Sequence, residues 1–445
     1  MTVVSPLSSP DAPALSPGGA GRTLFGHPPG LTSLFLTQMW AEFSYFGLQA
    51  LLVYYMTRHL HFSQGQSSLI YGLYGAAAFF SPFVGGIVAD RWLGRTRSVV
   101  LGGGLMMIGH FLMAFEGLLF PALALVAVGN GLFIPPLAVQ VGGLYAEDDP
   151  RRPQAFSAYY MGINLGGLLA PLVCGTLGEL YGWHWGFSAA GIGMAVGLAI
   201  YLGTLRLLPP DPAAGRIGGA RRTPLDAEDW RKLRLLLGIV LVIVLFRIGY
   251  EQSGNVIALW VDEQTDRHVA LMGLDFEIPA TWFQAVNPLL IILLTPPLIR
   301  FWRRHDRDGS PAALLRRMSL GCAIAAVAML VMVGAAALFG ATGRPVGAGW
   351  VLAYFLFLTL GELLTLPVGL SLIGLLSPVQ IAAMLMGAWY IAKFLGSLLA
   401  GVMGAYWGAI PATAFFGIGA ISVLAASAIL LAMSRRERAH PAGRS

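Results

Sequence analysis

The chain alternates between long apolar runs and short segments that are polar or rich in Gly and Pro. Each run is long enough to cross a bilayer, because about 20 residues at a rise of ~1.5 Å span the ~30 Å hydrocarbon core as a helix. Lipid offers an open backbone no hydrogen-bond partners, so such spans must be helical. Twelve runs lie at about 31–56, 66–90, 97–116, 120–145, 155–180, 184–207, 234–261, 279–301, 313–340, 348–376, 380–407 and 411–434. The pattern predicts an all-α membrane protein with twelve transmembrane helices.

Composition and charge agree with this prediction and orient the chain. It is 56% hydrophobic and only 11% charged, whereas soluble domains carry about 25% charged residues. With the N-terminus inside, 23 of the 28 Lys and Arg residues fall in segments that face the cytoplasm, as the positive-inside rule requires. Twenty-six of the 28 are Arg, which is typical of a GC-rich bacterium. We therefore expect a multi-pass protein of the bacterial inner membrane with both termini cytoplasmic.

An arginine-rich segment divides the twelve runs into six and six. Its Pro, Gly and Arg content favours a linker, whose charges we expect to meet anionic lipid headgroups rather than nucleic acid. The expected organisation is a disordered cytoplasmic arm (1–30), an N-terminal six-helix bundle (31–208), a cytoplasmic linker (209–233), a C-terminal six-helix bundle (234–435) and a cytoplasmic tail (436–445).

Five ionisable side chains interrupt the apolar runs near the expected bilayer midplane. They are Glu42, Arg247, Glu251, Glu362 and Lys393. A charge at that depth costs a few kcal/mol or more, so it needs a partner, a water-filled cavity or a substrate. With three acids and two bases the group carries one net negative charge. One bound proton would leave it neutral and able to receive a zwitterion.

On the first span, Gln38, Glu42, Tyr45 and Gln49 recur at helical spacing and form one polar stripe. A polar stripe on a spanning helix faces other helices or a cavity rather than lipid. Glu42 therefore serves either in a fixed interhelical link or in contact with substrate or proton, and the pattern leaves both open.

On the seventh span, Arg247 and Glu251 are four residues apart and can pair along one helix face. The pair either only neutralises itself or couples a proton, with Glu251 ionised beside Arg247 and protonated when that contact breaks. Lys393 lies one turn beyond Trp389 on the eleventh span. It either forms a static pair with Glu362 or, together with Arg247, binds substrate.

The connection between spans two and three reads Gly86-Ile-Val-Ala-Asp90-Arg91-Trp-Leu-Gly94-Arg95. Asp90 can pair with Arg91, Arg95 or a neighbouring helix end, which would make a latch that differs between conformations. The segment is similar to the loop signature of the major facilitator superfamily, although an ordinary Gly/Asp/Arg turn is the alternative. The resemblance implies two bundles that rock about a central site.

Further motifs resemble those of the proton-dependent oligopeptide transporter family, in order and at family spacing over nearly all of residues 31–434. They include Phe156-Ser-Ala-Tyr159-Tyr160-Met-Gly162-Ile-Asn164-Leu-Gly166-Gly167, Phe283-Gln284-Ala-Val-Asn287-Pro288 and Gly361-Glu362-Leu-Leu-Thr-Leu-Pro367. The resemblance implies a proton symporter of short peptides.

The chain departs from the family at the residues that the family associates with the peptide carboxylate. Glu42 stands where the family has its first-helix arginine, and Ile134 stands where it has a fourth-helix lysine. A second-helix tyrosine is replaced by Phe79. The residues that the family associates with the peptide amine are retained as Glu362 and Asn287.

We therefore expect a symporter that couples protons to the import of di- and tripeptides by alternating access, with a non-standard carboxylate site. The carboxylate is assigned to Arg247 or Lys393, and the amine to Glu362 with Asn287 or to Glu42. The proton is assigned to Glu251, Glu42 and Arg247. Other residues expected to line the pocket are Tyr45, Tyr160, Asn164, Trp389 and Gln38. Asn164 and Asn287 could instead bond only between helices.

Two alternatives remain. The same fold could carry another zwitterionic or anionic small molecule with altered proton coupling, or the chain could be a non-transporting sensor. An enzyme is disfavoured, because the sequence shows no metal-ligand cluster and no nucleophile–base arrangement. We expect no cofactor beyond the proton as coupling ion, contact with membrane lipids, no nucleic-acid partner and a monomeric chain.

Overall fold

A computed structural model describes residues 26–146, 149–211, 227–271, 274–305, 308–377 and 382–439. Most of the expected arm (1–30), the middle of the expected linker (209–233) and the end of the expected tail (436–445) therefore lie outside the described residues. The first helix begins at Pro29, the helix after the linker begins at Ala227, and the last helix continues to Ala439.

Helices account for nearly all of the described chain. The first group comprises α1 (Pro29–Tyr54), α2 (Gln64–Val88), α3 (Arg95–Leu112), α4 (Leu119–Gly143), α5 (Arg152–Ala170) and α6 (Trp183–Gly203). The second comprises α7 (Ala227–Tyr250), α8 (Val256–Gln264), α9 (Val286–His305), α10 (Pro311–Thr342), α11 (Gly349–Leu376), α12 (Ala382–Gly404) and α13 (Ala412–Ala439).

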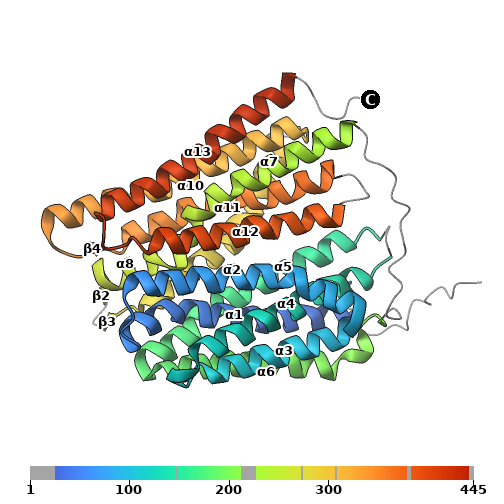
Figure 1. Cartoon of the computed structure of the whole chain (residues 1–445), viewed down its shortest axis with the longest axis horizontal. Coiled ribbons are helices and arrows are strands. Elements are labelled where there is room, and N and C mark those ends of the chain that lie inside the picture. The colour runs from blue at the N-terminus through green and yellow to red at the C-terminus, as the bar shows by residue number, and fades with distance from the viewer. Residues whose placement is uncertain are drawn as a thin grey trace, which may run out of the picture.

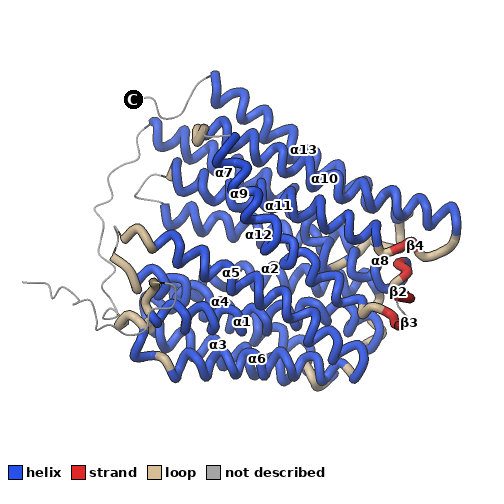
Figure 2. Tube along the Cα trace, turned by 180° about the vertical axis from the view of Figure 1, so that it is seen from behind, coloured by secondary structure: helices blue, strands red, loops and turns tan. Residues whose placement is uncertain are grey.

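The two groups form two side-by-side bundles, with α1–α6 in one and α7–α13 in the other (Figure 1). Within the described residues, nine helical segments are long and apolar enough to cross a membrane. The helices α1, α3 and α12 lie alongside them, and α7 and α8 together make one interrupted span (Figures 1 and 2). The predicted all-α architecture of twelve spans in two six-helix bundles is confirmed.

The two ends of the molecule differ. We call the end where α1 begins and α13 ends the terminus side. The opposite end, the hairpin side, carries the antiparallel pair β2 (His268–Leu271) and β3 (Leu274–Glu277), together with β1 (Thr265–Asp266) paired in parallel with β4 (Val346–Gly347) (Figure 2). The sequence analysis did not predict these short strands.

The bundles meet most closely where α2 crosses α12. A Cβ added to Gly401 would lie 2.8 Å from the Cα of Gly72, which is closer than real Cβ contacts allow. Small residues permit backbones to approach in this way in membrane helices. The crossing brings α2 of the N-terminal bundle against the α12 helix that carries Lys393.

The span made by α7 and α8 is broken near its middle. A short 3₁₀ segment, Glu251–Gly254, follows α7, and Asn255 leaves helical geometry at φ −114° and ψ −98°. The local sequence Ser253-Gly254-Asn255 contains weak helix formers, which favours a break at this position. The hydroxyl of Ser68 on α2 donates a 2.9 Å hydrogen bond to Oδ1 of Asn255, so the break is held by the opposite bundle.

Candidate functional site

The carboxylate of Glu42 is held by a buried hydrogen-bond chain inside the N-terminal bundle. Nε2 of Gln38 donates to Oε1 of Glu42 at 2.6 Å, and the hydroxyl of Tyr159 on α5 donates to Oε1 of Gln38 at 2.7 Å. The predicted stripe therefore faces neighbouring helices. The link to α5 runs through Gln38 rather than through an ion pair of Glu42.

The remainder of the stripe faces α2. The Tyr45 ring stacks on that of Tyr74 with centroids 6.2 Å apart, and Nε2 of Gln49 donates to the hydroxyl of Tyr71 at 2.8 Å. The Tyr45 hydroxyl is buried and has no hydrogen-bond partner among the described residues. It is thus a polar group available to water or to a ligand.

Arg247 near the end of α7 and Glu251 at the start of the 3₁₀ segment form the expected ion pair, with both side chains almost fully buried. The guanidinium carbon of Arg247 also lies 5.1 Å from the ring centroid of Tyr250 and 5.4 Å from that of Phe79 on α2. Glu251 and two aromatic faces thus surround the guanidinium of Arg247.

Glu362 on α11 receives two hydrogen bonds. The Tyr250 hydroxyl donates to Oε1 at 3.0 Å, and Nδ2 of Asn287 on α9 donates to Oε2 at 2.9 Å. The two residues assigned to the peptide amine are therefore together. Tyr250 was not among the predicted site residues, although its place between Arg247 and Glu251 was a signal that could have identified it.

Lys393 on α12 forms no ion pair within 4 Å among the described residues, so the static pair with Glu362 is not formed there. Its ammonium nitrogen lies 5.0 Å from the ring centroid of Phe79 and 5.5 Å from that of Tyr390. The same Phe79 ring contacts the guanidinium of Arg247, which also lies over the ring of Tyr250. Through Phe79, Tyr250 and the Arg247–Glu251 pair, four of the five midplane charges belong to one cluster between the bundles, whereas Glu42 bonds within the N-terminal bundle.

The other predicted lining residues differ in exposure. The Tyr160 side chain is 45% exposed, whereas that of Asn164 is buried and its Nδ2 donates to the backbone oxygen of Tyr160 at 3.0 Å. The Trp389 ring is 3% exposed and packs against Gly369 of α11, inside the C-terminal bundle. Of these three side chains, Tyr160 is the exposed one.

The loop between α2 and α3 turns at Gly94, whose φ of 77° is in the left-handed region that favours glycine. Asp90 and Arg91 are exposed, and neither Arg91 nor Arg95 forms an ion pair with Asp90 in the described part of the chain. The backbone N–H of Thr96 donates instead to Asp211 at 3.0 Å. The latch remains a prediction for another conformation.

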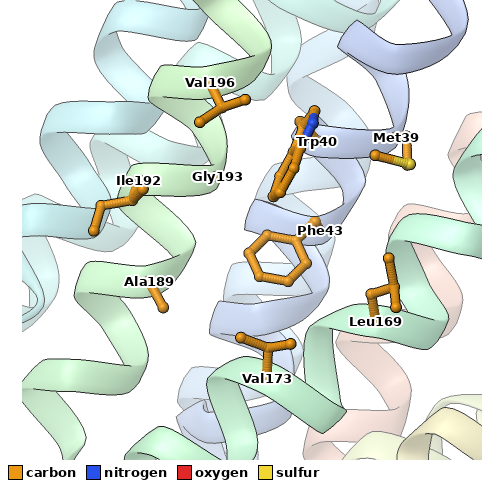
Figure 3. Close-up of a pocket in the computed structure, with 9 residues that line it drawn as sticks. All are labelled: Met39, Trp40, Phe43, Leu169, Val173, Ala189, Ile192, Gly193 and Val196. Atoms are coloured by element: carbon orange, nitrogen blue, oxygen red, sulfur yellow. The ribbon is translucent and has the colours of Figure 1, made fainter.

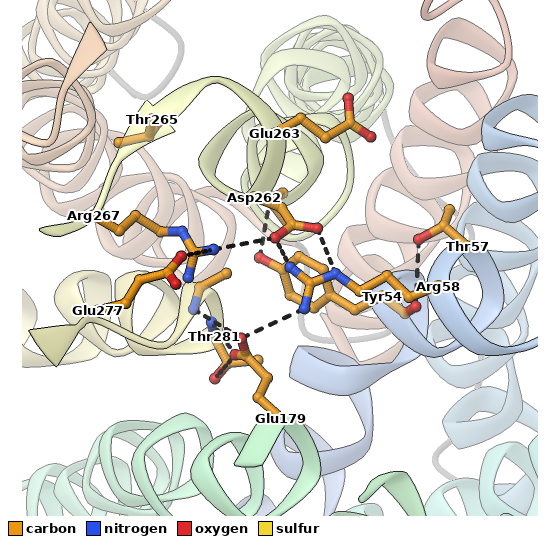
Figure 4. A network of polar contacts seen from close by, with 12 residues as sticks. Tyr54, Thr57, Arg58, Glu179, Asp262, Glu263, Thr265, Arg267, Glu277 and Thr281 are labelled. Atoms are coloured by element: carbon orange, nitrogen blue, oxygen red, sulfur yellow. Dashed lines mark hydrogen bonds and ion pairs between the residues drawn. The ribbon is translucent and has the colours of Figure 1, made fainter. Parts of the chain in front are cut away.

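The hairpin side carries a polar network that joins the bundles (Figure 4). Glu179 of the N-terminal bundle accepts hydrogen bonds from the backbone N–H groups of Ala280 (3.1 Å) and Thr281 (2.8 Å) and from the Thr281 hydroxyl (2.7 Å). Arg58 forms an ion pair with Asp262 of α8. The sequence analysis missed this network.

Between described residues, every hydrogen bond and ion pair that crosses from one bundle to the other lies between the midplane and the hairpin side. The structure is therefore sealed at the hairpin side.

Comparison with known proteins agrees with this architecture. A family model for the major facilitator superfamily matches residues 34–343. The di-/tripeptide transporter of Lactococcus lactis subsp. cremoris is 32% identical, with 93% of this chain and 96% of that protein covered. The peptide transporter YePEPT of Yersinia enterocolitica is also 32% identical, with 88% and 90% covered. A crystal structure of the peptide transporter POT in complex with sulfate superposes with a TM-score of 0.83 at 29% identity, covering 93% of this chain and 96% of that one.

The chain belongs to the proton-dependent oligopeptide transporter family of the major facilitator superfamily. It is accordingly a membrane transporter. The resemblance drawn from its motifs is confirmed.

An apolar pocket of about 280 Å³ lies between α1, α5 and α6 of this transporter (Figure 3). Met39, Trp40 and Phe43 line it from the face of α1 opposite the polar stripe. Ile192 and Val173, both exposed, line its outer part. With no charged residue in its lining, this pocket is separate from the charge cluster.

Proposed function

We propose that the chain is a proton-coupled symporter that imports di- and tripeptides by alternating access. One observation carries the proposal: a carboxylate held by two donors, Glu362, and an ammonium without an ion partner among the described residues, Lys393, belong to the same cluster through Phe79, Arg247 and Tyr250. These groups are complementary to the amine and the carboxylate of a zwitterion. The names of the 32% identical relatives support a short peptide as that zwitterion.

We assign the peptide carboxylate to Lys393. Arg247 is the other candidate, but its guanidinium is already paired with Glu251 and covered by the Tyr250 and Phe79 rings. A cation without an anionic partner gains more from a carboxylate than one whose charge is already balanced, because burial makes an uncompensated charge costly. The amine is assigned to Glu362, whose orientation Asn287 and Tyr250 fix.

The proton is assigned to Glu251, with Glu42 as a second acid near the midplane. Glu251 has a cationic partner in this conformation. A rearrangement that separates Arg247 from Glu251 would leave a buried carboxylate whose stable form is protonated, because an unpaired charge is expensive there. Proton uptake and release would then follow the bundle movement.

The positive-inside pattern supports an orientation in which the terminus side lies in the cytoplasm of a bacterium. A structure sealed at the hairpin side is then the inward-facing state. Basic residues at the terminus side would contact anionic lipids, and we propose a monomer that needs no cofactor.

Uptake into proteoliposomes tests the proposal. With a labelled dipeptide, accumulation should require an inward proton gradient. Lys393→Ala should raise KM about tenfold or more, Arg247→Ala should chiefly impair coupling, and Lys393→Arg serves as the charge-conserving control. If uptake does not depend on the proton gradient, the protein is not a proton symporter. If both alanine variants keep normal affinity and accumulation, the assignment of the peptide carboxylate to Lys393 or Arg247 is wrong. If a panel of peptides fails to compete with the labelled dipeptide, the substrate is another zwitterion.

A further inference from the structure

Phe79 of α2 contacts both cations of the charge cluster from the opposite bundle. The Phe79 ring centroid lies 5.0 Å from the Lys393 ammonium nitrogen and 5.4 Å from the Arg247 guanidinium carbon. Both cations belong to the C-terminal bundle, on α12 and α7. A ring of the N-terminal bundle therefore lies against the cationic half of a site built on the C-terminal bundle.

For Lys393 these ring contacts are not accompanied by an ion pair among the described residues. The ammonium lies near two aromatic rings, Phe79 and Tyr390, and has no ion pair within 4 Å among the described residues. A lysine head on a flexible four-carbon stem loses entropy when it is fixed in one place, so a prearranged ammonium binds an anion better than a mobile one. A ring face attracts the charge without being a carboxylate acceptor, so the ammonium N–H donors stay available to a ligand.

We propose that Phe79 is a positioning residue for the peptide carboxylate: its ring holds Lys393 where the carboxylate binds. This inference rests on the proposed function. Because Phe79 and Lys393 are on different bundles, the carboxylate site is complete only while α2 and α12 stay in contact at this level. The N-terminal bundle thus contributes to carboxylate recognition through a ring, although neither Glu42 nor Ile134 supplies a cation there.

The alternative role for Phe79 is packing between the bundles, and its neighbour provides the matched control. The Phe80 ring also crosses to α12, with its centroid 5.6 Å from that of Phe394, and it has no cation contact among the described residues. Phe80→Leu removes a cross-bundle aromatic contact of the same kind. Phe79→Tyr keeps a ring face for the two cations.

The test compares a zwitterionic dipeptide with the same dipeptide carrying a C-terminal amide. The affinity of each is measured by competition with a labelled substrate. For the dipeptide, KM and the maximal rate of uptake are measured as well. Phe79→Leu should raise KM for the dipeptide about two- to tenfold, which is the range expected for one cation–π contact. Its maximal rate and the affinity of the amide should change little. Phe79→Tyr should restore the wild-type KM, and Phe80→Leu should leave it unchanged. Equal weakening of the dipeptide and the amide, or no weakening in Phe79→Leu, would overturn the proposal.

A second measurement separates this inference from the proposed function. If the wild-type protein takes up no dipeptide, the proposed function fails, and the Phe79 contact is judged by a double-mutant cycle on thermal unfolding of the full chain. Phe79→Leu combined with Lys393→Met should lower the melting temperature by less than the sum of the two single changes. Strictly additive losses would show that ring and ammonium do not interact, which refutes the positioning role independently of any substrate.

Discussion

Nδ2 of Asn287 donates a 2.9 Å hydrogen bond to Oε2 of Glu362, and the two residues come from adjacent helices of the C-terminal bundle. The same amide donates to Oγ1 of Thr359 at 3.0 Å. Both amide protons are therefore used, and the amide is fixed with its donors toward the carboxylate.

Asn287→Leu should weaken binding of peptides with a free amine by about tenfold, because a hydrogen bond to a charged group is worth roughly 1.5–3 kcal/mol. Competition by a dipeptide and by its N-acetyl form measures the effect. The acetylated form, which lacks the charged amine, should bind wild-type and variant alike. Equal loss for both competitors would show that Asn287 acts on packing rather than on the amine site.

Arg247→Met should destabilise the protein by about 3–5 kcal/mol, because it leaves the buried Glu251 carboxylate without its partner. Adding Glu251→Gln should recover most of the loss, since no charge then remains to be compensated. Thermal unfolding in detergent compares the two. If the single and double variants melt at the same temperature, the pair makes no net contribution to stability.

Gly396→Ala should separate α12 from α7 at the charge cluster. A Cβ at position 396 would collide with the Cβ of Arg247, which has no room to move. Overpacking of this kind costs about 1–3 kcal/mol. Gly417→Ala on α13 is the control, because a Cβ there meets no atom within 4 Å. Similar melting temperatures for the two variants would contradict the close approach of α7 and α12.

Glu179→Gln should favour opening at the hairpin side, because neutral acceptors form weaker hydrogen bonds than carboxylates. A loss of about 1.4 kcal/mol would shift the ratio of closed to open molecules tenfold. Spin labels attached at Gly117→Cys and Ala341→Cys, in a protein without its native cysteines, measure the distance between the bundles at the hairpin side. Glu179→Gln should add a population with a longer distance between the two labels. Glu277→Gln removes an ion pair with Arg267 inside one bundle and should leave the distances unchanged.

Uptake should keep its pH profile when Asp149 is replaced by Asn. Hydrogen bonds from the Arg151 side chain lower the pKa of this loop carboxylate to about 2. A carboxyl group whose pKa is lower in the folded state stabilises the fold at pH values above its unfolded pKa of about 3.9. That stabilisation is lost as the pH falls through the folded pKa. Asp149 therefore stays ionised between pH 5 and 8. A shifted pH midpoint in Asp149→Asn would contradict this assignment.

Local spacing predicted the pair of Arg247 with Glu251 and a polar stripe that contains Gln38 and Glu42. Gln38 with Glu42, and Arg247 with Glu251, are four residues apart, and both pairs are joined in the structure. The twelve spans also follow from the apolar runs, because the bilayer fixes the length of each helix.

Contacts between distant elements could not be predicted in the same way. Tyr250 meets Glu362 over 112 positions, and Glu179 meets Thr281 over 102. Such contacts depend on the rotation and depth of each helix, which packing at positions such as Gly72 and Gly401 determines. The burial of Trp389 could not be predicted for the same reason. Its position one turn from Lys393 on the same helix does not show which neighbouring helix covers its ring.

The hairpin-side seal has a consequence for sequence variation in the C-terminal bundle. Two of the three donors to Glu179 are backbone N–H groups of Ala280 and Thr281. Side-chain exchange at these positions leaves the backbone donors in place, and only proline deletes one. The backbone share of the seal therefore survives side-chain exchange, whereas Trp282 and Gln284 of the same segment contribute through their side chains. Selection on the ease of opening can act through those two side chains as well as through Glu179.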